Sequence, residues 1–152
     1  MKLRELSSAL NKMENTAHLH KYFFISTNDT LTTLLPRVPD NYFTRHGYED
    51  NTTKRVCLSN SINGCLRAMS RNIEGETFQV YSAESASIYT PTTDEVPDCD
   101  ITGEVWSLET VRLRPLFKIK VLEAEYHPIE FPFDNGNRHA ALYDWKWEKC
   151  EP

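Results

Sequence analysis

The sequence predicts an α+β fold, and three observations lead to this prediction. At least five segments have the apolar runs or the alternation typical of β-strands, and only two have a helical period. The strands lie mostly in the second half of the chain, which fits α+β better than a regular alternation of strands and helices. The 152 residues, 39% of them hydrophobic and 26% charged, are enough for one packed domain spanning residues 1–152.

The first third of the chain is expected to contain a helix, a strand and a long loop. Residues 1–15 repeat apolar side chains at helical spacing, which predicts a short amphipathic helix packed on the main body. Residues 21–26 form a continuous apolar run, typical of a buried strand. Residues 34–53 contain two prolines, which exclude regular helix. Because long irregular loops are often functional, we expect this segment to line the largest cleft.

A strand followed by a helix is predicted next. Residues 54–59 have the pattern of a short strand, and Ser59, Asn60 or Ser61 can cap a helix from about 61 to 70. The helix carries one apolar stripe that we expect to be buried, formed by Ile62, Cys65, Leu66 and Met69.

The rest of the chain is mostly strand. Three short strands are predicted at residues 77–82, 87–90 and 104–108. The clearest alternation lies in residues 111–121, where apolar side chains face one way and Arg or Lys side chains the other. A proline within this run predicts an edge strand or a β-bulge. Residues 127–152 are rich in aromatics and prolines, and we expect them to wrap the body as a tail.

Composition and charge argue against several classes of function. With 17 Lys and Arg against 22 Asp and Glu, the net charge is -5 at pH 7, which argues against binding to duplex DNA. No segment approaches the roughly 20 apolar residues that span a bilayer. The N-terminus has no apolar secretory segment. We therefore expect a cytoplasmic protein that does not bind membranes.

The cysteines and histidines do not predict a metal site. The four cysteines form no C-x-x-C pair, so we expect reduced, buried thiols rather than a structural zinc site. His18 and His20 could share one strand face and chelate a metal, but the sequence shows no third ligand. We expect no bound metal.

Three charged side chains are candidates for chemistry, and each has a structural alternative. Glu104 opens a strand after a glycine, where a carboxylate can stabilise an oxocarbenium-like centre or can simply be exposed. Arg37 and Arg55 could grip a pyrophosphate through both arms of the guanidinium, or remain solvated. The P-loop, the Rossmann fingerprint and the G-x-S-x-G elbow are all missing from the sequence.

The order of five pieces along the chain carries a resemblance to a known family. The pieces are a strand ending at 25–27, a loop with 35–39, a strand-to-helix unit at 55–66, the Gly-Glu-Val-Trp at 103–106 and a closing strand at 117–121. In this order the chain resembles the small ADP-ribosyltransferase-like fold of bacterial and phage proteins. The resemblance implies a split, mainly antiparallel β-sheet with two or three helices, which holds NAD across a cleft.

The resemblance also implies an enzyme. The protein would be a transferase that moves ADP-ribose from NAD to a macromolecule, or an NAD glycohydrolase. Glu104 takes the acidic catalytic position of the family's last motif, whereas Phe23 and Phe24 replace the His or Arg of the first strand. The expected NAD-binding residues are Ser26 and Thr27 at the nicotinamide ribose, Arg37 or Arg55 at the diphosphate, Tyr42 or Tyr48 against nicotinamide, and Ser59 beside the cleft.

A non-catalytic function is the alternative. In this interpretation the protein is a phage-type inhibitor with an anti-defence role, and its partner is a host macromolecule rather than a nucleotide. Acidity, small size and aromatic content favour this interpretation, because aromatic side chains are enriched in interface hot spots. The aromatics in question are Tyr42, Phe43, Trp145 and Trp147, which could instead hold an irregular tail against the body.

Overall fold

The computed structural model describes most of the chain. It covers residues 21–38, 52–69, 71–96, 98–133 and 136–151, with the backbone alone between 126 and 143. The predicted N-terminal helix, most of the predicted loop, and Tyr42, Phe43 and Tyr48 lie outside the described residues.

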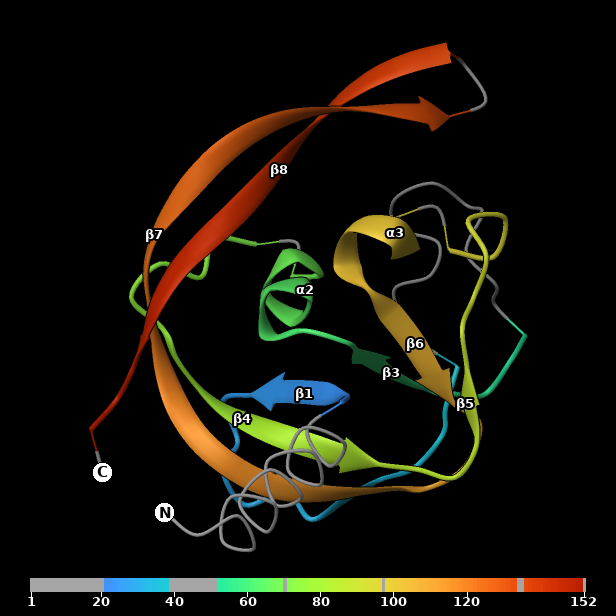
Figure 1. Ribbon diagram of the computed structural model, residues 1–152, viewed down its shortest axis with the longest axis vertical. Coiled ribbons are helices and arrows are strands. Elements are labelled where there is room, and N and C mark those ends of the chain that lie inside the picture. The colour runs from blue at the N-terminus through green and yellow to red at the C-terminus, as the bar shows by residue number, and fades with distance from the viewer. Residues whose placement is uncertain (1–20, 39–51, 70, 97, 134–135, 152) are drawn as a thin grey trace, which may run out of the picture.

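The described strands form one sheet of eight strands, in the order β2-β7-β4-β1-β3-β6-β5, with β8 paired to β7. Every described strand pair is antiparallel. Figure 1 shows the sheet curving around two short helices, with the β7–β8 hairpin arching over them. The strands are β1 (Phe23–Ser26), β2 (Thr33–Leu34), β3 (Val56–Ser59), β4 (Thr77–Glu84), β5 (Ile88–Tyr89), β6 (Glu104–Ser107), β7 (Val111–Phe133) and β8 (Gly136–Lys149), and the helices are α2 (Ile62–Arg67) and α3 (Cys99–Thr102). The predicted α+β class is confirmed.

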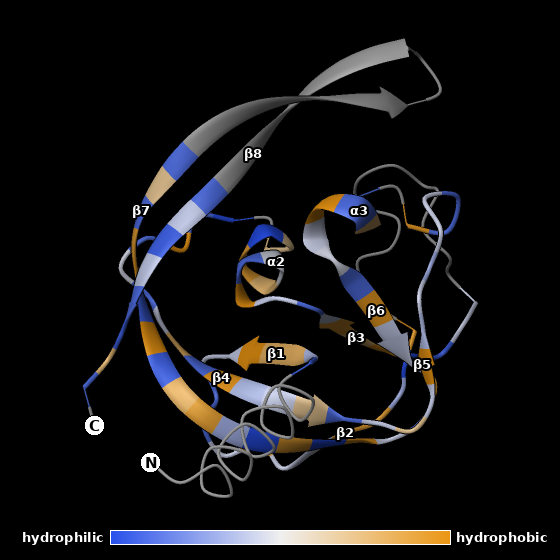
Figure 2. Ribbon diagram, viewed as in Figure 1, coloured by the Kyte–Doolittle hydropathy of each residue, from blue (hydrophilic) through white to orange (hydrophobic). Residues whose placement is uncertain are grey.

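The central strand β4 is buried on both faces, and the core therefore has two main parts. Residues 78–83 of β4 are all buried, and their side chains alternate between the two faces. The first cluster comprises Ile25, Leu66, Ile73, Phe78, Val80, Ile119, Val121 and Trp145. The second cluster comprises Val56, Leu58, Tyr81, Ala83, Val105, Val111 and Leu113. Figure 2 shows β1 as almost entirely hydrophobic, as expected for a strand that supplies both clusters.

A β-bulge divides β7 between the two clusters. Tyr81 pairs with Pro115, whereas the preceding Val80 pairs with Phe117, so Leu116 is an extra residue in β7. The apolar side chains of residues 111–121 therefore do not all lie on one face of the sheet. Residues 111 and 113 pack in the second cluster, and residues 119 and 121 pack in the first. The prediction of an edge strand or a β-bulge is confirmed by the bulge. On the side of β7 opposite β4, β2 pairs with residues 111–112 and β8 pairs from Ile119 onward.

Residues 127–152, expected as a wrapping tail, are mostly strand. β7 continues to Phe133 and β8 returns from Gly136, so the two form a long hairpin. At the base of the hairpin Trp145 is buried in the first cluster. Trp147 stacks on Phe117 with the ring centroids 6.5 Å apart. Both tryptophans therefore pack on the body of the protein.

Helix α2 is shorter than predicted but buries the predicted stripe. It runs over Ile62–Arg67, and the Ser61 hydroxyl caps it by accepting a hydrogen bond from the Gly64 N–H at 2.9 Å. Leu66 is fully buried. The other three residues of the stripe are partly buried and pack against the first cluster. In the described part of the chain, no helix is long and apolar enough to cross a membrane.

The sheet has a narrow junction between β1 and β3. These two strands share one register pair, Phe23 with Ser59. By contrast, β1 shares four register pairs with β4, and β3 shares four with β6. The sheet therefore consists of two well-paired parts, β2-β7-β4-β1 with β8 and β3-β6-β5, which meet at this point. Side chains near the junction have fewer strand neighbours, and a pocket opens there.

Candidate functional site

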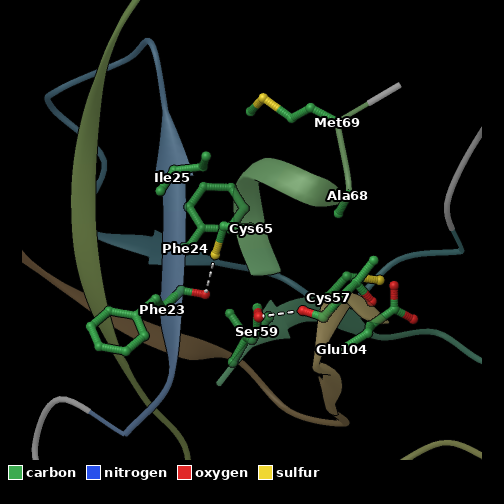
Figure 3. A pocket seen from close by; sticks show the side chains of 11 residues that line it. Phe23, Phe24, Ile25, Cys57, Ser59, Cys65, Ala68, Met69 and Glu104 are labelled. Atoms are coloured by element: carbon green, nitrogen blue, oxygen red, sulfur yellow. Dashed lines mark hydrogen bonds between the residues drawn. The ribbon is translucent and has the colours of Figure 1, made fainter. Parts of the chain in front are cut away.

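The pocket lies where β1, β3 and α2 meet, and it has a volume of about 200 Å³. Figure 3 shows the Phe23 and Phe24 rings on the β1 side and Glu104 beside Cys57 on the β3–β6 side. The described lining residues are Phe23, Phe24, Ile25, Cys57, Leu58, Ser59, Cys65, Ala68, Met69, Thr102 and Glu104. Most of these side chains are apolar, and Glu104 is the charged one among them. The pocket is thus an apolar recess with a carboxylate at one end.

A close contact between α2 and its neighbours holds one wall of the pocket. A Cβ atom on Gly64 would lie 2.0 Å from the Thr102 carbonyl oxygen and 2.2 Å from Ser59 Oγ. The Ser59 hydroxyl donates to the same Thr102 carbonyl oxygen at 2.6 Å. Glycine therefore allows α2 to approach β3 and α3 closely, and this approach brings Cys65 and Met69 to the pocket.

Glu104 is held in place by its own strand. It is the first residue of β6 and pairs with Ser59 of β3. Because side chains two residues apart share one face of a strand, Trp106 lies on the same face as Glu104. The indole Nε1–H of Trp106 donates to Glu104 Oε2 at 2.7 Å. Glu104 is half-buried. Its Oε2 accepts the hydrogen bond from the indole, and such a bond to a carboxylate is charge-assisted.

Arg55 lies on the same face of the sheet as Glu104 and Trp106. It is not among the described residues that line the pocket. Its guanidinium carbon stacks 4.0 Å from the Trp106 ring centroid, and Nη1 donates to the Thr53 carbonyl at 3.1 Å. The residue is 2% exposed. Its backbone N–H and C=O pair with those of Arg37 at 3.0 Å each, and Arg37 is exposed. Trp106 thus connects Arg55 to Glu104.

The other predicted site residues lie elsewhere or have structural partners. Ser26 and Thr27 are not among the described residues that line the pocket. The Ser26 hydroxyl accepts a hydrogen bond from the Asn28 N–H at 3.0 Å, in the turn after β1. Ser59 does line the pocket, and its hydroxyl is bonded to Thr102. Of the predicted residues, the structure brings together Glu104 and Ser59, with Arg55 on the same face.

Two thiols, Cys65 in the pocket and Cys99 of α3, have pKa values raised above the ordinary value. Burial raises the pKa of the Cys65 thiol to about 12, and this thiol contacts the Phe23 carbonyl at 3.5 Å. Burial also raises the pKa of Cys99, with a smaller contribution from nearby acidic groups, Asp100 first. Because the thiolate is the nucleophile, neither residue is prepared for nucleophilic chemistry. Among the residues that the structure describes, no group of three or more His, Cys, Asp or Glu side chains could hold a metal ion.

Sequence reasoning missed several residues of this site. Cys57 and Met69 line the pocket, and nothing in their local sequence distinguishes them from ordinary core residues. The position of Trp106 beside Glu104 could have been predicted from the sequence. The Gly-Glu-Val-Trp segment places the two residues two apart on a predicted strand, where their side chains share one face. Phe23 and Phe24 of β1 also line the pocket, and their rings project from opposite faces of the strand.

The comparisons with known proteins do not assign the chain to a family. No protein-family model, no curated protein and no solved structure matches it. The geometry of the junction pocket is therefore the basis for a functional proposal.

Proposed function

We propose that the junction pocket binds the nicotinamide end of NAD or of a related nucleotide, and that the protein uses it for ADP-ribosyl transfer or NAD hydrolysis. The observation that carries the proposal is the position of the Glu104 carboxylate at one end of an apolar pocket. Ligand pockets are commonly apolar with a few polar groups that set orientation. The narrow β1–β3 junction supports an ADP-ribosyltransferase-like arrangement, in which a split sheet holds NAD across a cleft.

The size of the pocket suits one ring of such a ligand. An apolar cavity of about 150 Å³ accommodates benzene. The junction pocket, at about 200 Å³, has room for a six-membered ring and a small substituent such as a carboxamide. Phe23, Phe24 and Met69 are among the lining residues, and apolar side chains of this kind are suited to contact an aromatic ring. The pocket does not hold a whole dinucleotide, so the remaining groups would lie outside it.

The rest of the ligand would extend along β3. Arg55 precedes Ser59 by four residues, which is about 13 Å in an extended strand. Arg55 is buried against Trp106, whereas its backbone partner Arg37 is exposed. We therefore assign the diphosphate to the exposed Arg37, because a guanidinium can bind phosphate oxygens in two contacts. In this proposal Arg55 supports the sheet and does not bind the ligand.

Glu104 supplies the electrostatic part of the chemistry. NAD provides a ribose carbon that gains positive charge as its bond to nicotinamide breaks. A carboxylate fixed next to this carbon stabilises the charge in the transition state more than in the ground state. The apolar side chains around Glu104 exclude water and strengthen this interaction. The same carboxylate can orient the hydroxyl or water that attacks the ribose carbon.

The test combines NAD binding with turnover in Glu104→Gln. In the wild-type protein, NAD at 100 times its Kd should stabilise the fold by about 2.7 kcal/mol. This corresponds to a rise in Tm of about 5–11 °C for a domain of this size. Release of nicotinamide should be measurable by chromatography. Glu104→Gln should keep Kd within about threefold and lower turnover by at least about 100-fold.

Glu74→Gln is the matched control, because Glu74 is an exposed carboxylate outside the pocket. It should match the wild-type protein in both measurements. Absence of any NAD-dependent shift in Tm would contradict the proposal and favour the non-catalytic interaction protein. Binding with no turnover in the wild-type protein would contradict the enzymatic part alone.

A further inference from the structure

We infer that Trp106 is a positioning residue for Glu104: its indole N–H sets the direction of the carboxylate at the pocket. The inference rests on the proposed function, since it assigns Trp106 a role in the chemistry of the same site. The Nε1–Oε2 distance is 2.7 Å, at the short end of the range for N–H···O bonds. A bond to a charged acceptor is stronger than one between neutral groups. Trp106 is not among the described residues that line the pocket, so in this inference it acts through Glu104.

The geometry of the strand makes this contact possible. Glu104 and Trp106 are two residues apart in β6, so both side chains project from one face. Their partners in β3 are Ser59 and Cys57, both of which line the pocket. The indole N–H therefore reaches the Glu104 carboxylate on the same face of the strand.

The donor itself is immobile, which distinguishes this contact from an ordinary surface hydrogen bond. Trp106 is 1% exposed and packs with Val96 and Cys99. The Arg55 guanidinium lies 4.0 Å from its ring centroid, and the Tyr89 ring centroid lies 5.5 Å away. Turning the indole would disrupt all of these contacts. A fixed donor restricts the rotamers of the Glu104 carboxylate before any ligand arrives, which is the condition for electrostatic preorganisation.

The expected consequence is a loss of turnover without a comparable loss of affinity. A misplacement of about 1 Å in a catalytic group can lower the rate by about 100-fold. Trp106→Phe keeps an aromatic ring beneath Arg55 and removes the N–H. We expect kcat to fall by about 10- to 100-fold and KM to change by less than about threefold. A purely structural role would instead lower the fraction of folded protein and leave the kcat of the folded fraction unchanged.

Trp145→Phe is the matched control, because Trp145 is a buried tryptophan of the first cluster and lies outside the pocket lining. It should cost comparable stability and leave kcat within about twofold of the wild-type value. Stability of both variants is measured by urea denaturation, and kcat is expressed per folded protein. Wild-type kcat in Trp106→Phe, when the wild-type protein releases nicotinamide, would overturn the positioning role and leave the proposed function intact.

A second measurement does not depend on turnover. The indole ¹H–¹⁵N resonance of Trp106, assigned by its loss in Trp106→Phe, should shift in Glu104→Gln, because an amide replaces the carboxylate that accepts the indole hydrogen bond. In Glu74→Gln the same resonance should stay at its wild-type position. An indole resonance that is identical in the wild-type protein and Glu104→Gln would overturn the inference. A shifted indole resonance in Glu104→Gln, when the wild-type protein releases no nicotinamide, would support the contact with Glu104 and contradict the enzymatic part of the proposed function.

Discussion

Substitution of Gly64 by alanine is expected to destabilise the protein, opposite to its usual effect in a helix. Alanine in place of glycine within a helix is normally favourable by about 0.5–1 kcal/mol. Here the new Cβ would lie 2.0 Å from the Thr102 carbonyl oxygen, 2.2 Å from Ser59 Oγ and 2.9 Å from Ser61 Oγ. All three distances are shorter than van der Waals contact, so the neighbours of α2 must move.

The cost has two parts. The Ser59 side chain can rotate away, but it then loses its 2.6 Å bond to the buried Thr102 carbonyl, and an unsatisfied group of this kind costs about 1–3 kcal/mol. Thr102 O belongs to the backbone, so α3 and α2 must separate, and overpacking typically costs about 1–3 kcal/mol. After the favourable contribution of alanine to the helix is subtracted, we expect the free energy of unfolding to fall by about 1–5 kcal/mol.

The assay is urea denaturation followed by circular dichroism, with Gly75→Ala for comparison. No atom lies within 4 Å of a Cβ on Gly75, whose φ of +81° makes alanine strained. The left-handed conformation alone costs about 1–2 kcal/mol. If the proposed function holds, Gly64→Ala should also weaken NAD binding, because Cys65 and Met69 of the same segment line the pocket. A Gly64→Ala protein as stable as the wild type would refute the close packing of α2 against Ser59 and Thr102.

Two further predictions concern the core and the pH dependence. Leu66→Ala should cost about 2–5 kcal/mol, because Leu66 is fully buried in the first cluster; a loss below about 0.5 kcal/mol in urea denaturation would contradict this packing. Burial raises the pKa of Cys65 from 9.0 to about 12, so above pH 9 the unfolded chain releases a proton that the folded chain keeps. The stability that depends on the protonated thiol is therefore complete below pH 9 and decreases as the pH rises toward 12. Between pH 9 and 10.5 the wild-type protein should lose stability more steeply than Cys65→Ala, by up to about 1.4 kcal/mol per pH unit; equal slopes would contradict the burial of this thiol.

The positions of most strands and of α2 could be predicted from the sequence, because the signals are local. The β3–α2 unit follows from an apolar run, a serine cap at Ser61 and a stripe that includes Leu66. The role of Glu104 as a candidate acid followed from its place after Gly103. Its contact with Trp106 is also local, since residues two apart on a strand share a face.

The arrangement of these elements was decided only in the tertiary structure. β1 pairs with β4 across more than fifty residues of chain, and the local pattern of neither strand specifies its partner. The bulge at Leu116 moves the second half of β7 to the other cluster, although the residue sequence continues to alternate.

The pocket likewise depends on contacts between distant segments. Gly64 is an unremarkable helix glycine in the sequence, yet Ser59 and Thr102 occupy the space that a side chain would need. The sequence by itself determined the short strands β1, β3, β4, β5 and β6, the first part of β7, helix α2 and the candidate acid, because hydrophobic period and capping act over a few residues. It did not determine β2, α3 or the β7–β8 hairpin beyond residue 121. Only the tertiary structure decided that β1 and β3 meet at one pair and open a pocket beside Glu104, because strand pairing joins segments whose separation along the chain leaves no local trace.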